Sequence, residues 1–205
     1  PYHQHKYDNC GFWYTNYNSL NFFSNDTIPT GSALLYPNIG DRYDLPDSFS
    51  VSFWINPKYS RRQKPDIQGN IVREYPAGTV LHISSSIAVS IVSGSSVDEL
   101  GVEDEFKVLI QLSQSADIPP SKINLASLKG PYPRDLIFTS SHVLKKNNWH
   151  NVFIAWSSGV NNGSGSLFID DKETTFHIPS ASVSANKTLS PSFLSVGNYY
   201  DGIYA

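Results

Sequence analysis

Alternating apolar and polar residues mark short extended segments along this chain. The clearest segment covers residues 49–55, in which every second side chain is apolar. A period of two places alternate residues on the same face of a strand. The apolar members of this segment are Phe49, Val51, Phe53 and Ile55. We therefore predict a strand whose four apolar side chains are buried together against a core.

Similar short apolar runs recur along the rest of the chain. The further strands that they predict cover residues 33–36, 70–73, 79–84, 87–92, 106–112, 136–139, 151–156, 166–169, 174–178 and 193–196. Segments rich in Gly, Asn and Asp, such as 161–165 and 170–171, separate them and suit hairpin turns with positive φ. This pattern predicts an all-β sandwich or barrel. The longer polar or Pro-interrupted stretches 59–69 and 113–134 are expected to be loops that carry specificity.

The composition agrees with this fold class and argues against several partners. The 205 residues include 15 Lys and Arg against 18 Asp and Glu, which gives a net charge of −3 and no positive field to attract nucleic acid. No apolar run approaches the roughly 20 residues that span a bilayer. Cys10 is the single cysteine, so the core has no intrachain disulfide. We expect one domain with no nucleic-acid partner and no membrane span.

Six segments occur in an order that resembles a known family. They are 31–34 (GSAL), 45–47 (LPD), 49–57 (FSVSFWINP), 148–152 (NWHNV), 166–171 (SLFIDD) and 194–198 (LSVGN). The ordered set resembles the concanavalin A-like lectin and glucanase superfamily, and within it the laminin G-like jelly-roll domains. The resemblance implies a two-sheet antiparallel jelly-roll sandwich over residues 31–205. Residues 1–30 would form an N-terminal arm or an edge strand.

The end of the chain departs from this family pattern. In the family, the closing segment usually continues through Asp-Gly into a final strand with an acidic pair, whereas here Asp201 and Gly202 are followed by Ile-Tyr-Ala. The last strand could lie in a longer parent chain, or another segment or a neighbouring subunit could replace it. We favour a larger polypeptide or assembly, because a sandwich that lacks a strand leaves an edge unpaired.

Catalysis is not expected from the acidic residues of this chain. Family members that cleave polysaccharides place two carboxylates on alternate strand positions, on either side of the glycosidic bond. The nearest acidic cluster here contains Glu99, Glu103, Asp104 and Glu105. Glu103 and Glu105 would share a face only in a strand that begins before them, and the neighbouring Gly101 indicates a turn. We interpret the cluster as loop charges and expect a non-catalytic domain.

Aromatic residues in predicted loops are the candidates for ligand binding. Tyrosine rings there could stack on a sugar or pack in a protein interface. The candidate residues are Tyr59, Tyr75, Tyr132, Tyr199 and Tyr200. By contrast, Trp54, Trp149 and Trp156 lie in or beside predicted strands, and we expect them in the core.

A calcium site is a second expectation that comes from the resemblance. Many laminin G-like and lectin-like jelly rolls hold Ca²⁺ at the rim of the sandwich through carboxylate and carbonyl oxygens, the ligands that this ion prefers. The candidate ligands here are Asp26, Asp44, Asp47 and Asp201. None belongs to a tight ligand motif, so the alternative interpretation as turn carboxylates is preferred.

Three classes of function remain open at this point. The favoured one is a non-catalytic recognition or structural module of a larger extracellular or virion-surface assembly, which binds a glycan or a protein surface. The second is a soluble glycan-binding lectin, and the third is a glycan-cleaving hydrolase. The resemblance rather than any single residue supports this order.

Overall fold

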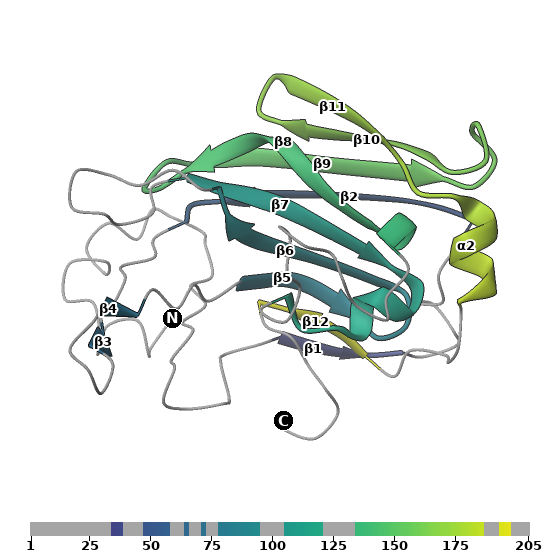
Figure 1. Cartoon of the computed structure of the whole chain (residues 1–205), viewed down its shortest axis with the longest axis horizontal. Helices are drawn as coiled ribbons and strands as arrows, with labels where there is room; N and C mark the ends of the chain where they lie inside the picture. Colours follow the sequence, from purple (N-terminus) through teal and green to yellow (C-terminus); the bar gives the residue numbers. More distant parts are fainter. Residues whose placement is uncertain are drawn as a thin grey trace.

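Two antiparallel β-sheets face each other in the computed structural model of the chain (Figure 1). The structure describes residues 34–38, 47–57, 64–65, 71–72, 78–94, 105–120, 134–186 and 193–197. Over these residues the fold is an all-β sandwich with a jelly-roll-like architecture, which confirms the predicted fold class. The expected N-terminal arm, residues 1–30, lies outside the described residues.

The larger sheet has six strands in the order β1-β12-β5-β6-β7-β8. Their bounds are β1 Leu34–Pro37, β12 Phe193–Val196, β5 Gly78–Ile83, β6 Ile87–Ser93, β7 Glu105–Leu112 and β8 Ile137–Lys145. The smaller sheet has four strands in the order β11-β10-β9-β2. Their bounds are β11 Lys172–His177, β10 Ser164–Ile169, β9 His150–Ser157 and β2 Ser48–Ile55. Both sheets therefore join strands that are distant in the sequence.

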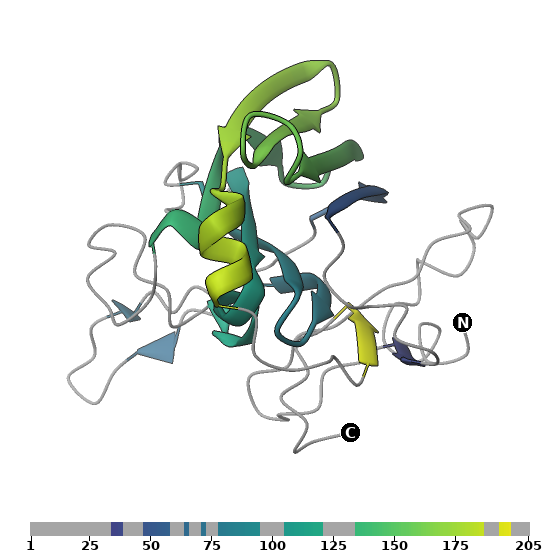
Figure 2. The ribbon, with the colours of Figure 1, turned by 90° about the vertical axis from the view of Figure 1, so that its right-hand side faces the viewer.

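Short elements complete the described part of the chain. Strands β3 (Lys64–Pro65) and β4 (Ile71–Val72) form a separate two-stranded ladder. A 3₁₀ turn, η2 (Ser113–Asp117), follows β7, and another, η4 (Arg134–Leu136), precedes β8. The helix α2 (Ser180–Ala185) follows β11 and lies at one end of the sandwich, as Figure 2 shows.

Most of the predicted strands are present with shifted ends. Residues 193–196 match β12, whereas β8 extends to Lys145, well past the predicted end at 139. The polar residues Ser140, Ser141 and His142 interrupt the apolar pattern of β8. The register with β7 shifts across these three residues, between the pair Lys107–Val143 and the pair Leu109–Thr139. They stay in the strand because the pairing holds on both sides of them, and the Ser140 hydroxyl accepts a hydrogen bond from the Val108 N–H at 3.0 Å. Pairing to a neighbouring strand thus overrides the local sequence signal.

The main core lies between the two sheets. Val89 and Ile110 from the larger sheet and Ile154 and Leu167 from the smaller sheet have no exposed surface. Phe138 and Phe176 stack across the sandwich with ring centroids 4.7 Å apart. These side chains belong to one cluster of buried apolar residues, so hydrophobic burial holds the two sheets together.

The face predicted for residues 49–55 is confirmed, but its full burial is not. Exposed and half-buried positions alternate along β2, with Phe49, Phe53 and Ile55 packed against the core. All four apolar side chains, including Val51, remain partly accessible to solvent. The reason is that β2 pairs only with β9 among the described strands, so it forms an edge of the smaller sheet.

The two sheets differ in the face that points away from the core. In the larger sheet, Ser90 and Leu109 pair across β6 and β7 on that outer face, and both are fully buried. The turn η2 covers part of this face, because Gln111 Nε2 donates hydrogen bonds to the carbonyls of Ser115 and Ile118 at 2.5 Å and 3.0 Å. The outer face of the smaller sheet is instead accessible along all four strands.

Candidate functional site

Small polar side chains cover one end of the outer face of the smaller sheet. The strand registers place Ser48, Ser157, Ser164 and His177 side by side in a first row across the four strands. The adjacent row contains Ser50, Ala155, Ser166 and Thr175. Because side chains alternate between the two faces of a strand, both rows point away from the core residues Phe49, Trp156 and Phe176.

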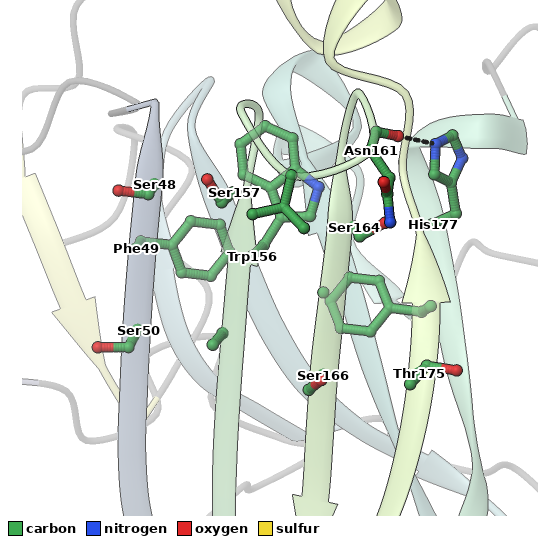
Figure 3. Close-up of a pocket in the computed structure, with 14 residues that line it drawn as sticks. Ser48, Phe49, Ser50, Trp156, Ser157, Asn161, Ser164, Ser166, Thr175 and His177 are labelled. Atoms are coloured by element: carbon green, nitrogen blue, oxygen red, sulfur yellow. Dashed lines mark hydrogen bonds between the residues drawn. The ribbon is translucent and has the colours of Figure 1, made fainter.

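A hollow of about 970 Å³ opens over these two rows. Its lining combines the two rows with Phe49, Trp156, Val160, Asn161, Gly165 and Phe176 (Figure 3). All fourteen lining residues belong to the smaller sheet or to the loop between β9 and β10, and none comes from the larger sheet. The hollow is therefore on the outer surface of the sandwich and not between its sheets.

The lining of the hollow is uncharged and mixes hydroxyl groups with a larger share of apolar and aromatic surface. Its lining residues include no Asp, Glu, Lys or Arg, and His177 is the one titratable side chain among them. Six hydroxyl groups, from Ser48, Ser50, Ser157, Ser164, Ser166 and Thr175, can each donate and accept hydrogen bonds. Such a surface suits a neutral ligand that carries many hydrogen-bonding groups.

The loop between β9 and β10 forms one wall of the hollow. Asn161, Asn162 and Gly163 all have positive φ, as the Gly- and Asn-rich sequence of this turn predicts. A side chain at Gly163 would place its Cβ 2.0 Å from the Ile178 carbonyl oxygen, so glycine is required there. The exposed Val160 and Asn161 reach the hollow because this loop folds back toward β11, where His177 Nε2 lies 3.2 Å from the Asn161 carbonyl (Figure 3).

Two internal contacts fix the floor of the hollow. Phe49 and Trp156 stack beneath the first row with ring centroids 6.0 Å apart. The indole Nε1 of Trp156 donates to the carbonyls of Gly163 and Ile178, both at 3.1 Å. These hydrogen bonds satisfy the buried indole and connect the floor to the loop, so we expect the hollow to keep its shape without a ligand.

Aromatic side chains replace the serines further along the same face. Past Ser52, the third row contains Phe153 and Phe168, whose ring centroids are 6.1 Å apart. Trp54 lies in the fourth row, opposite Asn151, and is 67% exposed. The outer face therefore changes from hydroxyl groups at the hollow to aromatic rings at the opposite end of β2.

A histidine–aspartate pair holds the turns near this aromatic end. His150 Nδ1 lies 2.8 Å from Asp170 Oδ2, and its Nε2 accepts a hydrogen bond from the Lys145 backbone N–H at 2.8 Å. Burial raises the pKa of the Asp170 carboxyl, but the hydrogen bonds from His150 and the Asn151 N–H outweigh it and lower the pKa below its ordinary value. The pair connects the β8–β9 turn to the β10–β11 hairpin.

A second histidine–aspartate contact lies on the outer face of the larger sheet. His82, almost fully buried, has its Nε2 3.5 Å from Asp117 Oδ1. The backbone N–H and the hydroxyl of Ser85 donate to the two oxygens of the same carboxylate, at 2.8 Å and 2.7 Å. Asp117 thus fastens η2 to the β5–β6 turn. A Ser–His–Asp triad would need the imidazole between serine and carboxylate, so this arrangement holds a turn instead.

The residues predicted to bind ligands lie almost entirely outside the described part of the chain. Tyr59, Tyr75, Tyr132, Tyr199 and Tyr200 are outside it, as are Asp26, Asp44 and Asp201. Asp47 is described, is exposed, and accepts a hydrogen bond from the Ser158 N–H through its backbone carbonyl. Among the described residues no group of three His, Cys, Asp or Glu side chains could hold a metal ion. The tyrosine and calcium sites remain predictions.

Two of the three tryptophans expected in the core lie on the surface. Trp156 is 3% exposed and packs in the core as predicted, but Trp54 is 67% and Trp149 is 43% exposed. The alternation itself explains Trp54, which shares its face of β2 with the serines and not with Phe53. The alternation along β2 therefore indicates an exposed side chain at position 54, although tryptophan as a residue type suggests a core position.

The acidic cluster is only partly described. Glu105 is the first residue of β7, where it pairs in register with Lys145 of the larger sheet, so it belongs to a strand and not to a loop. Glu99, Glu103 and Asp104 lie outside the described residues. Glu105 therefore lies on the larger sheet, whereas the hollow lies on the smaller sheet.

No family model matches the chain, and a search of curated proteins finds no significant sequence match. The two-sheet architecture by itself does not identify a superfamily, so the resemblance to laminin G-like domains remains a prediction. In the part of the chain that the structure describes, no helix has the length and hydropathy to cross a membrane.

Proposed function

We propose that this chain is a non-catalytic recognition module whose ligand binds on the outer face of the smaller sheet. The observation that carries the proposal is the uncharged hollow of about 970 Å³ over Ser48, Ser164 and their neighbours. The hollow is at the upper end of the range of about 300–1,000 Å³ found for ligand pockets. A glycan or a protein segment is the proposed ligand.

The contrast between the two outer faces supports this location. The outer face of the larger sheet is buried at Ser90, Leu109 and Gln111, so it has no room for a ligand there. The outer face of the smaller sheet combines accessible hydroxyl groups with exposed aromatic rings, and aromatic residues are enriched where proteins bind partners. It is the described surface with the most suitable chemistry for recognition.

The chemistry of this surface supports hydrolysis less well than it supports binding. Glycoside hydrolysis by a retaining mechanism needs two carboxyl groups about 5–5.5 Å apart, and an inverting mechanism needs them further apart. The residues that line the hollow contribute no carboxylate, and Glu173 at its border accepts a hydrogen bond from Ser166 at 2.9 Å. We therefore propose binding without cleavage. Following the family resemblance, the module would serve in an extracellular or virion-surface assembly.

Blocking the hollow tests the proposal directly. Ala155 lies in the centre of the second row, so Ala155→Arg would project a long side chain over the hollow without entering the core. Ligands are first identified by applying the full chain to a glycan array and to candidate surface proteins. We expect Ala155→Arg to abolish the binding that is found, while Tyr36→Arg, at an exposed position on β1 of the larger sheet, leaves it intact. Binding that survives Ala155→Arg would contradict the proposal.

A further inference from the structure

The edges of the two main sheets differ in how well they are protected against pairing with another strand. An edge strand presents unpaired N–H and C=O groups, and proteins block such edges with short strands, Pro, charged side chains or β-bulges. The described strands at the four edges are β1, β8, β11 and β2. Three of these four edges carry at least one such device.

Strands β1, β8 and β11 are the protected ones. β1 has four residues and ends at Pro37. β11 carries the charged residues Lys172 and Glu173. In β8 the register with β7 is irregular between Thr139 and Val143, as in a β-bulge. These features disfavour the addition of another strand at these three edges.

The free edge of β2 has none of these devices. The strand is eight residues long, contains neither Pro nor a charged residue, and pairs with β9 in an unbroken register from Ser48 to Ile55. Among the described strands it pairs with β9 alone, and Figure 2 shows it, in dark blue, at the margin of the smaller sheet. The backbone groups on its other side are therefore available to a further strand.

The side chains of β2 are incompletely covered as well. Phe49, Val51 and Phe53 point toward the core and yet remain partly accessible to solvent. On the outer face, the indole of Trp54 is 67% exposed. A strand added at this edge would cover apolar surface on both faces of β2, so the hydrophobic effect favours its addition.

The sequence of β2 suits pairing with a second copy of itself. A two-fold axis perpendicular to the sheet makes the two strands antiparallel and places one residue opposite its own copy. Opposite residues then come from the same face, so apolar side chains meet apolar ones and serines meet outer-face residues. The overlap is longest with the axis at Val51 or Ser52. Because β2 carries no charge, this self-pairing brings no like charges together.

The same pairing would add a residue to the hollow. The hollow reaches the free edge of the sheet at Ser48 and Ser50. With the axis at Val51, Trp54 of the second copy lies opposite Ser48, and with the axis at Ser52 it lies opposite Ser50. In either register, each copy contributes its exposed indole to the rim of the other copy's hollow.

We infer that the chain forms a two-fold dimer through β2, in which the two smaller sheets join into one continuous sheet and Trp54 of each copy borders the hollow of the other. The association itself does not depend on the proposed function. A stable interface buries about 800 Å² on each partner, and a single pair of strands covers less. We therefore expect a dissociation constant of about 1–100 µM.

Sedimentation velocity of the full chain at about 1–500 µM tests the dimer. Ser50→Lys combined with Ser52→Lys should weaken association about tenfold or more, because the pairing brings these positions of the two copies together. Leu34→Lys combined with Tyr36→Lys is the matched control, at exposed alternate positions of β1, and should leave association unchanged. A parent chain that is monomeric over the whole range, or association that the β2 charges do not weaken, would overturn the inference.

Charge complementation tests whether β2 pairs with β2. Ser50→Glu combined with Ser52→Glu should weaken association as the Lys variant does, and an equimolar mixture of the two variants should restore it, since Lys then lies opposite Glu. Circular dichroism checks that each variant is folded. A mixture of folded variants that fails to associate more tightly than either variant alone would overturn the self-pairing.

Disulfide cross-linking tests the position of Trp54. In a Cys10→Ser background, a Trp54→Cys chain should form an intermolecular disulfide with a Ser48→Cys or a Ser50→Cys chain under mild oxidation. Opposite residues in antiparallel strands have Cα atoms about 4.5–5.5 Å apart, which suits a disulfide. Thr175→Cys on β11, at the opposite edge of the smaller sheet, should not cross-link. No cross-link at either serine would overturn the placement of Trp54.

The outcomes separate this inference from the proposed function. If the dimer and its cross-link form but ligand binding survives Ala155→Arg, the inference stands and the proposed ligand site is wrong. If the chain is monomeric and Ala155→Arg abolishes ligand binding, the dimer is wrong and the proposed site stands.

Discussion

The outer faces of the two sheets differ in their exposure to solvent, although both point away from the same core. On the larger sheet, Leu109 and Gln111 point away from the core and are still fully buried, partly beneath η2. On the smaller sheet, the equivalent positions hold serine, threonine and exposed aromatic side chains. The first face adds a second buried layer to the protein, and the second is accessible to solvent, where we propose that a ligand binds. Substitutions on the two faces should therefore have different consequences.

The largest effect should follow from removing a buried side chain on the outer face of the larger sheet. Leu109→Ala is expected to lower the free energy of unfolding by about 2–5 kcal/mol, because it removes buried apolar area and leaves a cavity. Trp54→Ala on the other outer face removes a larger side chain but should cost less than about 1 kcal/mol, since most of that side chain is in solvent. Urea unfolding of both variants measures the contrast. Similar losses would mean that the two faces do not differ as described.

The loop that borders the hollow should depend on one glycine. Gly163→Ala is expected to cost more than about 2 kcal/mol, because its φ of +119° disfavours a side chain and the added Cβ would meet the Ile178 carbonyl. Gly159→Ala in the same loop is the matched control, because its added Cβ would have only one contact, at 3.8 Å. Thermal unfolding compares the two, and a Gly163→Ala variant as stable as Gly159→Ala would contradict this geometry.

Acid should weaken the contact that fastens η2 over the larger sheet. Burial raises the pKa of Asp117, but hydrogen bonds from His82 and Ser85 outweigh it and keep the pKa below its ordinary value of 3.8. A carboxyl whose pKa is lower in the folded state stabilises the fold fully above its unfolded pKa, and this stabilisation is lost as the pH falls through the folded pKa.

Replacing this carboxylate tests the prediction. Asp117→Asn should be less stable than the parent at neutral pH and should lose less stability below pH about 4, because the titrating group is absent. Urea unfolding at a series of pH values gives both quantities. Asp171→Asn, at an exposed position where the structure describes no hydrogen bond from its side chain, is the control. Parallel acid profiles for the parent and Asp117→Asn would rule out this role.

The smallest effect on stability should come from the serines of the hollow. Ser50→Ala and Thr175→Ser are expected to change the free energy of unfolding by less than about 0.5 kcal/mol, because both side chains are exposed. In contrast, Ser50→Ala should weaken ligand binding measurably. Denaturation and binding assays on the same samples separate the effect on stability from the effect on binding. A large loss of stability would show that this face has a structural role after all.

Much of the fold could be predicted from local sequence patterns. The period of two in residues 49–55 identified the core face of β2, and the nearly continuous apolar runs at 87–92 and 106–112 contain the signal of strands buried on both faces. Glycine and asparagine marked the tight turn after β9. These features depend on neighbouring residues, so they are present in the sequence before any tertiary contact forms.

The candidate site could not be predicted in this way, because it exists only after the strands have paired. Ser48, Ser157, Ser164 and His177 become neighbours through the order β2-β9-β10-β11, which brings β2 beside segments that lie far along the chain. None of these residues belongs to a motif. A single serine does not indicate a site, and the row of serines forms only when the strands pair in register. The exposure of Trp54 likewise depends on β2 lying at an edge with no cover among the described residues on its outer face.

Local sequence patterns therefore predict the all-β class, the core face of residues 49–55 and the turns with positive φ at 161–163 and 170. Those properties arise from the two-residue period of extended backbone and from local steric preferences. The tertiary structure alone decided which sheet has an accessible outer face, where the hollow lies, and how the two histidine–aspartate contacts fasten distant turns. The physical reason is that solvent access, row alignment and buried polar contacts are set by strand order and layer packing, which no local pattern encodes.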